Sequence, residues 1–130
     1  MGRIKVILNP YAGRGTGARL RERVAGALRQ AGVDFDLVET TAPGEAIALA
    51  AAALREGYET VAAAGGDGTA NEALNGLAQA TPAGERIGRL ALLPIGTGND
   101  LADMLGIPRD LQAAAQRVQA GKVRRIDVGR

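Results

Sequence analysis

Short apolar runs alternate along the chain with longer segments in which apolar residues recur every three or four positions. The short runs are typical of buried strands, and the periodic segments are typical of helices with one face against a sheet. This alternation predicts an α/β fold of three layers, with a mostly parallel sheet and helices on both faces. The runs predicted as strands span residues 4–8, 34–39, 60–64, 90–93 and 123–128.

The predicted helices have start or stop signals beside their periodic patterns. Gly32 is expected to close the first helix and Gly57 the second, and the last helix spans 110–120. Thr69 and Glu72, three residues apart, suit a capping box, so the third helix is expected to begin at Thr69. The side chains predicted to face the core are Leu20, Val24, Ala27, Leu28 and Ala31 in the first helix, Ile47, Ala50 and Leu54 in the second, Ala73, Leu74 and Leu77 in the third, and Leu111, Ala114, Ala115 and Val118 in the last.

The composition excludes several classes of site. A chain without Cys or His has no disulfide framework, zinc finger, thiol nucleophile or Ser-His-Asp triad, so any metal must be a hard cation bound by oxygen. A net charge of +2 and three aromatic residues give little support to nucleic-acid binding. No apolar run suits a signal peptide or a membrane span, which predicts a cytoplasmic protein that at most touches a membrane from outside. The 130 residues fit one domain.

Three glycine-rich segments each follow a predicted strand, at residues 9–17, 65–69 and 96–100. In a parallel sheet these segments are expected to meet at one edge, outside the carboxyl ends of the strands, where ligands bind. Glycines let backbone N–H groups face outward, and a following helix adds its positive dipole end, so phosphate is the expected ligand. For the first segment, ordinary turn chemistry is the alternative. Neither a Walker motif nor a GxGxxG pattern is present at these positions.

Asp67 and Asp100 stand among these glycines. Uncompensated carboxylates would repel phosphate, and a hard divalent cation such as Mg²⁺, held through water, would resolve that conflict. Helix capping is the alternative for both, most plainly for Asp100, which stands at the start of a short predicted helix. Asp103, Asp110 and Asp127 are expected on the surface or as caps.

Four arginines crowd the first glycine segment and the helix after it: Arg14, Arg19, Arg21 and Arg23. They could meet phosphate or an anionic lipid surface. Glu22 interrupts the run, which favours a solvated helix face instead.

Together these segments resemble a known family. NPYAG at 9–13, GGDGTANE at 65–72 and PIGTGNDLA at 94–102 look like the three signatures of the diacylglycerol kinase catalytic domain, a family of bacterial lipid kinases that also includes sphingosine and ceramide kinases. GGDGT alone is shared with NAD kinases and phosphofructokinases, and the other two segments make the likeness specific. The resemblance implies a Rossmann-like N-terminal domain over residues 1–130, a piece of a two-domain protein whose C-terminal β-sandwich domain is absent from this sequence.

The resemblance also implies roles for individual residues. Asp67 and Asp100 would be the catalytic and metal-binding residues. Asp67 would organise Mg²⁺ and the phosphates or help to activate the acceptor hydroxyl, and Asp100 would support the same network. Glu72 would position this network, with capping as the equal alternative. The implied ATP contacts are Asn9, Thr40, Gly65, Gly66, Asp67, Gly68, Thr69, Ala70, Asn71, Gly96 and Thr97.

The implied reaction is ATP- and Mg²⁺-dependent transfer of the γ-phosphoryl group to a lipid hydroxyl at the membrane surface, most directly diacylglycerol giving phosphatidate. One alternative is an NAD kinase, and another is a nucleotide-binding module that is inactive without its second domain. The expected partners are ATP and the lipid alcohol, without nucleic acid, and a homodimer is left open.

Overall fold

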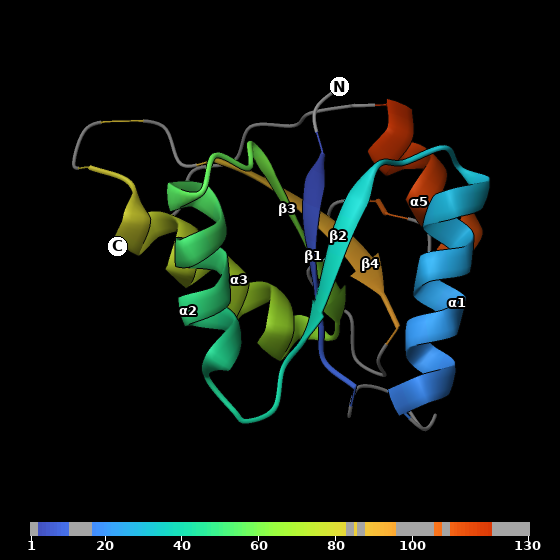
Figure 1. The fold of residues 1–130 in the computed structure, drawn as a ribbon, viewed down its shortest axis with the longest axis horizontal. Coiled ribbons are helices and arrows are strands. Elements are labelled where there is room, and N and C mark those ends of the chain that lie inside the picture. Colours follow the sequence, from blue (N-terminus) through green and yellow to red (C-terminus); the bar gives the residue numbers. More distant parts are fainter. Residues whose placement is uncertain are drawn as a thin grey trace.

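The computed structural model describes residues 3–10, 17–82, 85, 88–95, 106–107 and 110–120. Strands and helices alternate along this part of the chain and form an α/β fold, as predicted (Figure 1). The elements are β1 (Ile4–Leu8), α1 (Gly17–Gln30), β2 (Phe35–Glu39), α2 (Glu45–Arg55), β3 (Thr60–Gly65), α3 (Asp67–Ala80), β4 (Arg89–Pro94) and α5 (Leu111–Ala120).

The four described strands form one sheet in the order β2–β1–β3–β4, and every neighbouring pair is parallel. Val6 in β1 lies opposite Leu37 in β2 and Ala62 in β3. The prediction of a parallel sheet is therefore confirmed for these strands, whose bounds lie within two residues of the expected ones. The predicted strand over 123–128 and the predicted short helix after residue 100 lie outside the described residues.

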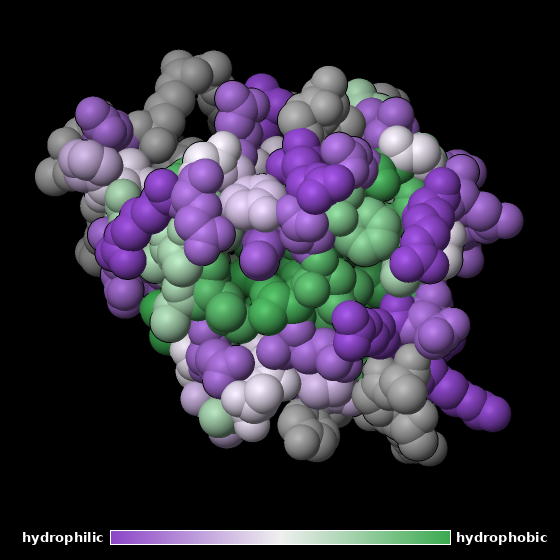
Figure 2. Space-filling view, viewed as in Figure 1, coloured by the Kyte–Doolittle hydropathy of each residue, from purple (hydrophilic) through white to green (hydrophobic). Residues whose placement is uncertain are grey.

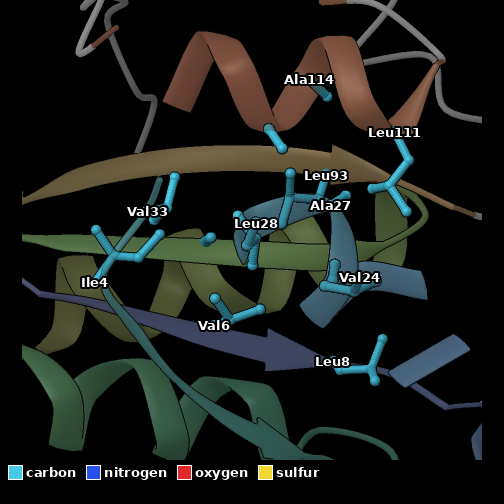
Figure 3. Close-up of a cluster of buried hydrophobic side chains, with 13 residues drawn as sticks. Ile4, Val6, Leu8, Val24, Ala27, Leu28, Val33, Leu93, Leu111 and Ala114 are labelled. Atoms are coloured by element: carbon cyan, nitrogen blue, oxygen red, sulfur yellow. The ribbon is translucent and has the colours of Figure 1, made fainter. Parts of the chain in front are cut away.

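Helices cover both faces of the sheet because successive residues of a strand point to opposite sides. In β1, Val6 and Leu8 belong to the core under α1 and α5, and Ile7 belongs to the core under α2 and α3. Figure 3 shows the first of these cores, with Leu111 and Ala114 of α5 on one side of β4. The three-layer prediction is thus confirmed. Among the described helices, none combines the length and the apolar character that crossing a membrane requires.

The core-facing side of α2 agrees only in part with the prediction. Of the three residues expected there, Ala50 is buried and Leu54 packs against the same core, whereas Ile47 is only half-buried. The residues of α2 that are buried are all alanines: Ala46, Ala50, Ala51 and Ala53. Spacing rules weight large apolar residues, but here the helix lies too close to its neighbour for large side chains to fit between them.

Gly76 in α3 shows how close this approach is. A Cβ atom at residue 76 would overlap the carbonyl oxygen of Ile47 in α2 and would lie 2.9 Å from the Ala50 Cβ. The backbones of α2 and α3 therefore pack directly against each other, and this contact fixes where α3 lies on the sheet.

β2 is an edge strand of the described sheet. Figure 2 shows a band of apolar residues across this side of the molecule, over the region where Figure 1 draws β2. Phe35, Leu37 and Val38 of β2 are all half-buried. The strand also carries Asp36 and Glu39, and charged side chains on an edge strand oppose pairing with other chains.

We predict opposite effects for the same substitution in two helices. Gly76→Ala forces α2 and α3 apart and should lower the free energy of unfolding by about 1–3 kcal/mol. Gly26→Ala in α1 places its Cβ in open space and should raise it by about 0.5–1 kcal/mol, because alanine favours a helix over glycine. Denaturant unfolding of both variants checks this pair. Equal effects of the two substitutions would contradict the close contact between α2 and α3.

Candidate functional site

The carboxyl ends of the described strands lie along one edge of the sheet. The hydrogen-bond ladder continues beyond the strands, since the Thr40 N–H donates to the Leu8 carbonyl at 2.8 Å and the Asn9 N–H donates to the Ala64 carbonyl at 3.0 Å. Thr40, Asn9 and Gly65 therefore stand next to one another at the ends of β2, β1 and β3. These are three of the positions at which the sequence predicts ATP contacts.

The order of the strands creates a topological switch point on this edge. From β1 the chain passes through α1 to β2 on one side, and the strands β3 and β4 follow on the other side. The helix after β1 lies on one face of the sheet and the helix after β3 lies on the other. In open α/β sheets, ligands bind outside the carboxyl ends of the strands at such a switch point. Here it lies between Asn9 and Gly66.

α3 begins directly at this point, and its start differs from the prediction. Gly66 is the N-cap, in an extended conformation (φ −96°, ψ −162°), and it makes no side-chain capping hydrogen bond. The helix begins at Asp67, so the expected capping box of Thr69 and Glu72 is wrong. A glycine cap has no side chain to satisfy the first-turn N–H groups, and Thr69 lies inside that first turn with 5% of its surface exposed.

Gly65, which precedes this turn, and Gly68, which lies within it, have different roles. A Cβ atom at Gly65 would lie 2.5 Å from the Thr69 Oγ1, so the packing of Thr69 requires a glycine there. A Cβ atom at Gly68 would meet nothing within 4 Å, and Gly68 is exposed in a helical conformation. The described residues therefore give no reason for glycine at 68, where alanine would favour the helix. An uncovered backbone at this turn leaves room for a ligand to approach its N–H groups closely.

The other residues predicted around α3 have contrasting environments. The side chain of Ala70 packs into the core under α2 and α3, so only its backbone belongs to the edge of the sheet. Asn71 is exposed on α3, and Glu72 is half-buried. The structure thus brings Asn9, Thr40 and residues 65–71 to one edge of the sheet. Residues 96–105, with the predicted Gly96, Thr97 and Asp100, lie outside the described residues, and so does the first glycine segment over 11–16.

Asp67 is the acidic residue of the first turn of α3, and it is half-buried. In the part of the chain that the structure describes, no three acidic side chains gather into a metal site. Mg²⁺ usually takes only one or two carboxylates and completes its shell with water and substrate phosphates. A single carboxylate beside an uncapped helix start fits that mode of binding, so Asp67 can serve as one of the metal ligands.

The arginines of α1 bear on the open choice between an anion contact and a solvated helix face. Arg19, Arg21 and Arg23 are exposed on α1, and Arg21 forms an ion pair with Glu39 of β2 at 3.5 Å. Arg14 lies outside the described residues. The three described arginines therefore occupy a solvated helix face, which is the interpretation that the sequence favours.

Sequence reasoning missed two groups of polar contacts. At the corner after β2, the Glu45 carboxylate accepts hydrogen bonds from Thr41. At the opposite edge of the sheet, Arg3 bridges Asp34 and Asp36, and the Tyr58 hydroxyl donates to Asp36. This hydrogen bond raises the pKa of the Tyr58 phenol above its usual range. The partners of Arg3 lie more than thirty residues away along the chain, and no short-range pattern indicates such pairs.

Comparison with known proteins gives a consistent result. Residues 3–130 match the model of the family described as the diacylglycerol kinase catalytic domain. The chain is 44% identical over 131 residues to a diacylglycerol kinase of Bacillus subtilis and 35% identical over 130 residues to one of Staphylococcus saprophyticus. These alignments cover 99% and 98% of the chain, but only 42% and 41% of the relatives.

A solved structure has the same fold. The crystal structure of a diacylglycerol kinase from Bacillus anthracis superimposes with a TM-score of 0.76 at 29% identity, covering 92% of this chain and 40% of that one. The chain thus spans about two-fifths of the length of the proteins it matches.

Proposed function

The chain belongs to the diacylglycerol kinase catalytic domain family, and on that basis we propose that it is the nucleotide-binding domain of a lipid kinase. The whole protein would transfer the γ-phosphoryl group of ATP to a lipid hydroxyl, with diacylglycerol as the acceptor and phosphatidate as the product. Because the chain spans about two-fifths of its relatives' length, the acceptor site is assigned to the whole protein and not to residues 1–130.

The observation that carries this proposal is the start of α3. It lies at the switch point of a parallel sheet, its N-cap is a glycine, and Gly68 leaves the first turn uncovered. The first-turn N–H groups of a helix and the positive end of its dipole bind phosphate at such a position. We place the β- and γ-phosphates of ATP there, with the nucleoside extending toward Asn9 and Thr40.

In the proposed reaction the acceptor oxygen forms a bond to the γ-phosphorus, the bond from that phosphorus to the bridging oxygen breaks, and ADP leaves as the hydroxyl proton is lost. Such transfer depends mainly on positioning and on stabilising negative charge. The first-turn N–H groups of α3 hold the phosphates in place and donate to the charge that develops on them. Asp67 would hold Mg²⁺, with Asp100 as the proposed second carboxylate. When bound, Mg²⁺ neutralises charge on the phosphates.

The function is tested by incubating the full-length protein with labelled ATP, Mg²⁺ and a panel of lipid alcohols. We expect label in phosphatidate when diacylglycerol is present. If NAD is labelled and no lipid is, the NAD kinase alternative replaces the proposal. If ATP binds and no acceptor is labelled, the domain is a binding module.

Replacing the Asp67 carboxylate by an uncharged amide should weaken the binding of Mg²⁺. In Asp67→Asn, the Mg²⁺ concentration needed for half-maximal activity should rise by at least about tenfold, because a metal ligand loses its charge. Asp34→Asn removes the same charge at the opposite edge of the sheet, where Asp34 pairs with Arg3, and should leave the Mg²⁺ dependence unchanged. Activity assays across a Mg²⁺ titration measure both. An unchanged Mg²⁺ dependence in Asp67→Asn would remove Asp67 from the metal site.

Gly68→Ala should separate binding from stability. A methyl group at this position meets no atom of the described residues within 4 Å, so it should leave the fold intact while it obstructs the phosphates. We expect the Kd for ATP to rise by about tenfold, or 1.4 kcal/mol. Gly26→Ala, which is also unobstructed, is the matched control and should not change the Kd. Calorimetric titration measures both values, and equal ATP affinity in the two variants would place the phosphates elsewhere.

A further inference from the structure

The corner between β2 and α2 is closed by a side chain that turns back onto the loop. The Glu45 carboxylate accepts a hydrogen bond from the Thr41 N–H at 3.1 Å through Oε1 and another from the Thr41 hydroxyl at 2.6 Å through Oε2. Gly44, the N-cap of α2, is in the left-handed conformation with φ of 83°. The five residues from 40 to 44 are thus held from both ends, by the ladder at Thr40 and by Glu45.

The start of α2 does not need this contact. The Glu45 N–H donates to the Ala42 carbonyl at 3.3 Å, and the Ile47 N–H donates to the Gly44 carbonyl at 3.1 Å. The donors bound by the Glu45 carboxylate belong to Thr41, which precedes the helix. Both Thr41 hydrogen bonds lie at the exposed surface, where such bonds contribute little to global stability. Their main effect is therefore on the local geometry of the loop.

The loop over residues 40–44 lies two strands away from the proposed phosphate position at the start of α3. Thr40 follows β2, and the start of α3 follows β3, two strands away across β1. Two interstrand spacings are about 10 Å. A nucleotide whose phosphates lie at the start of α3 would extend its ribose and base across such a span. The N–H of the buried Thr40 donates to Leu8 of β1, which holds the strand side of this residue, and Glu45 holds Thr41 on its other side.

We propose that Glu45 is a positioning residue for the nucleoside half of the ATP site. Its carboxylate holds Thr41, and through the main chain it holds Thr40 against the end of β1. Glu45 itself touches no substrate. This inference rests on the proposed function, because it takes ATP as the ligand and the start of α3 as the phosphate position.

The test compares three variants of the full-length protein. Glu45→Ala removes both acceptors and should raise the Kd and KM for ATP by about fivefold, because the released loop must then be ordered when ATP binds. The kcat at saturating ATP and the KM for the lipid should stay unchanged. Glu45→Gln keeps one acceptor oxygen and should fall between Glu45→Ala and the wild type. Glu56→Gln alters an exposed carboxylate at the other end of α2 and should have no effect.

The outcomes separate this inference from the proposed function. Unchanged ATP affinity in Glu45→Ala, a lower kcat, or an equal change in Glu56→Gln would overturn the positioning role while lipid phosphorylation by the wild type stands. A wild type that binds ATP with the expected Glu45 effect but labels no lipid would overturn the proposed function alone. A wild type that binds no ATP would overturn both.

Discussion

The close packing of backbone against backbone around α3 is the constraint on which the rest of this domain depends. Gly76 lets α3 touch α2, and Gly65 leaves room for the Thr69 side chain at the junction with β3. A side chain at position 76 would force α3 away from α2, and one at position 65 would collide with Thr69 at the start of α3. The same contacts bring the uncapped first turn of α3 to the switch point of the sheet. The proposed phosphate position therefore follows from small residues in the packing around α3.

Most of the architecture could be predicted from the sequence because its signals are local. Apolar runs and helical periodicity identified the four described strands and the helices between them, and Gly32 and Gly57 both stand at positive φ as helix stops. The errors came from packing. The alanine face of α2 reflects how near α3 lies, and the start of α3 at Asp67 reflects a glycine cap where a threonine cap was expected. Neither cause can be read from spacing alone.

The candidate site, too, was predicted only in part. Asn9 and the turn from Gly65 to Asp67 were predicted from glycine-rich segments that follow strands, and Thr40 was implied by the family resemblance. The parallel ladder brings all three to one edge. The pairing of Glu45 with Thr41 was missed because the two residues stand four apart across the start of α2, whereas the capping-box signal relates residues three apart. The difference between Gly65 and Gly68 could also not be predicted from the sequence. The packing of Thr69 requires Gly65, whereas nothing in the described fold requires Gly68. Only atomic packing shows this difference.

The central claim is that the phosphates of ATP are bound by the first-turn N–H groups of α3. The most direct measurement is a ¹H–¹⁵N NMR titration of the full-length protein with Mg²⁺ and a non-hydrolysable ATP analogue, observing each backbone amide. We expect the largest shifts at the amides of Asp67, Gly68 and Thr69, with smaller shifts at Asn9 and Thr40. Unmoved amides in this turn, together with large shifts at another part of the molecule, would contradict it.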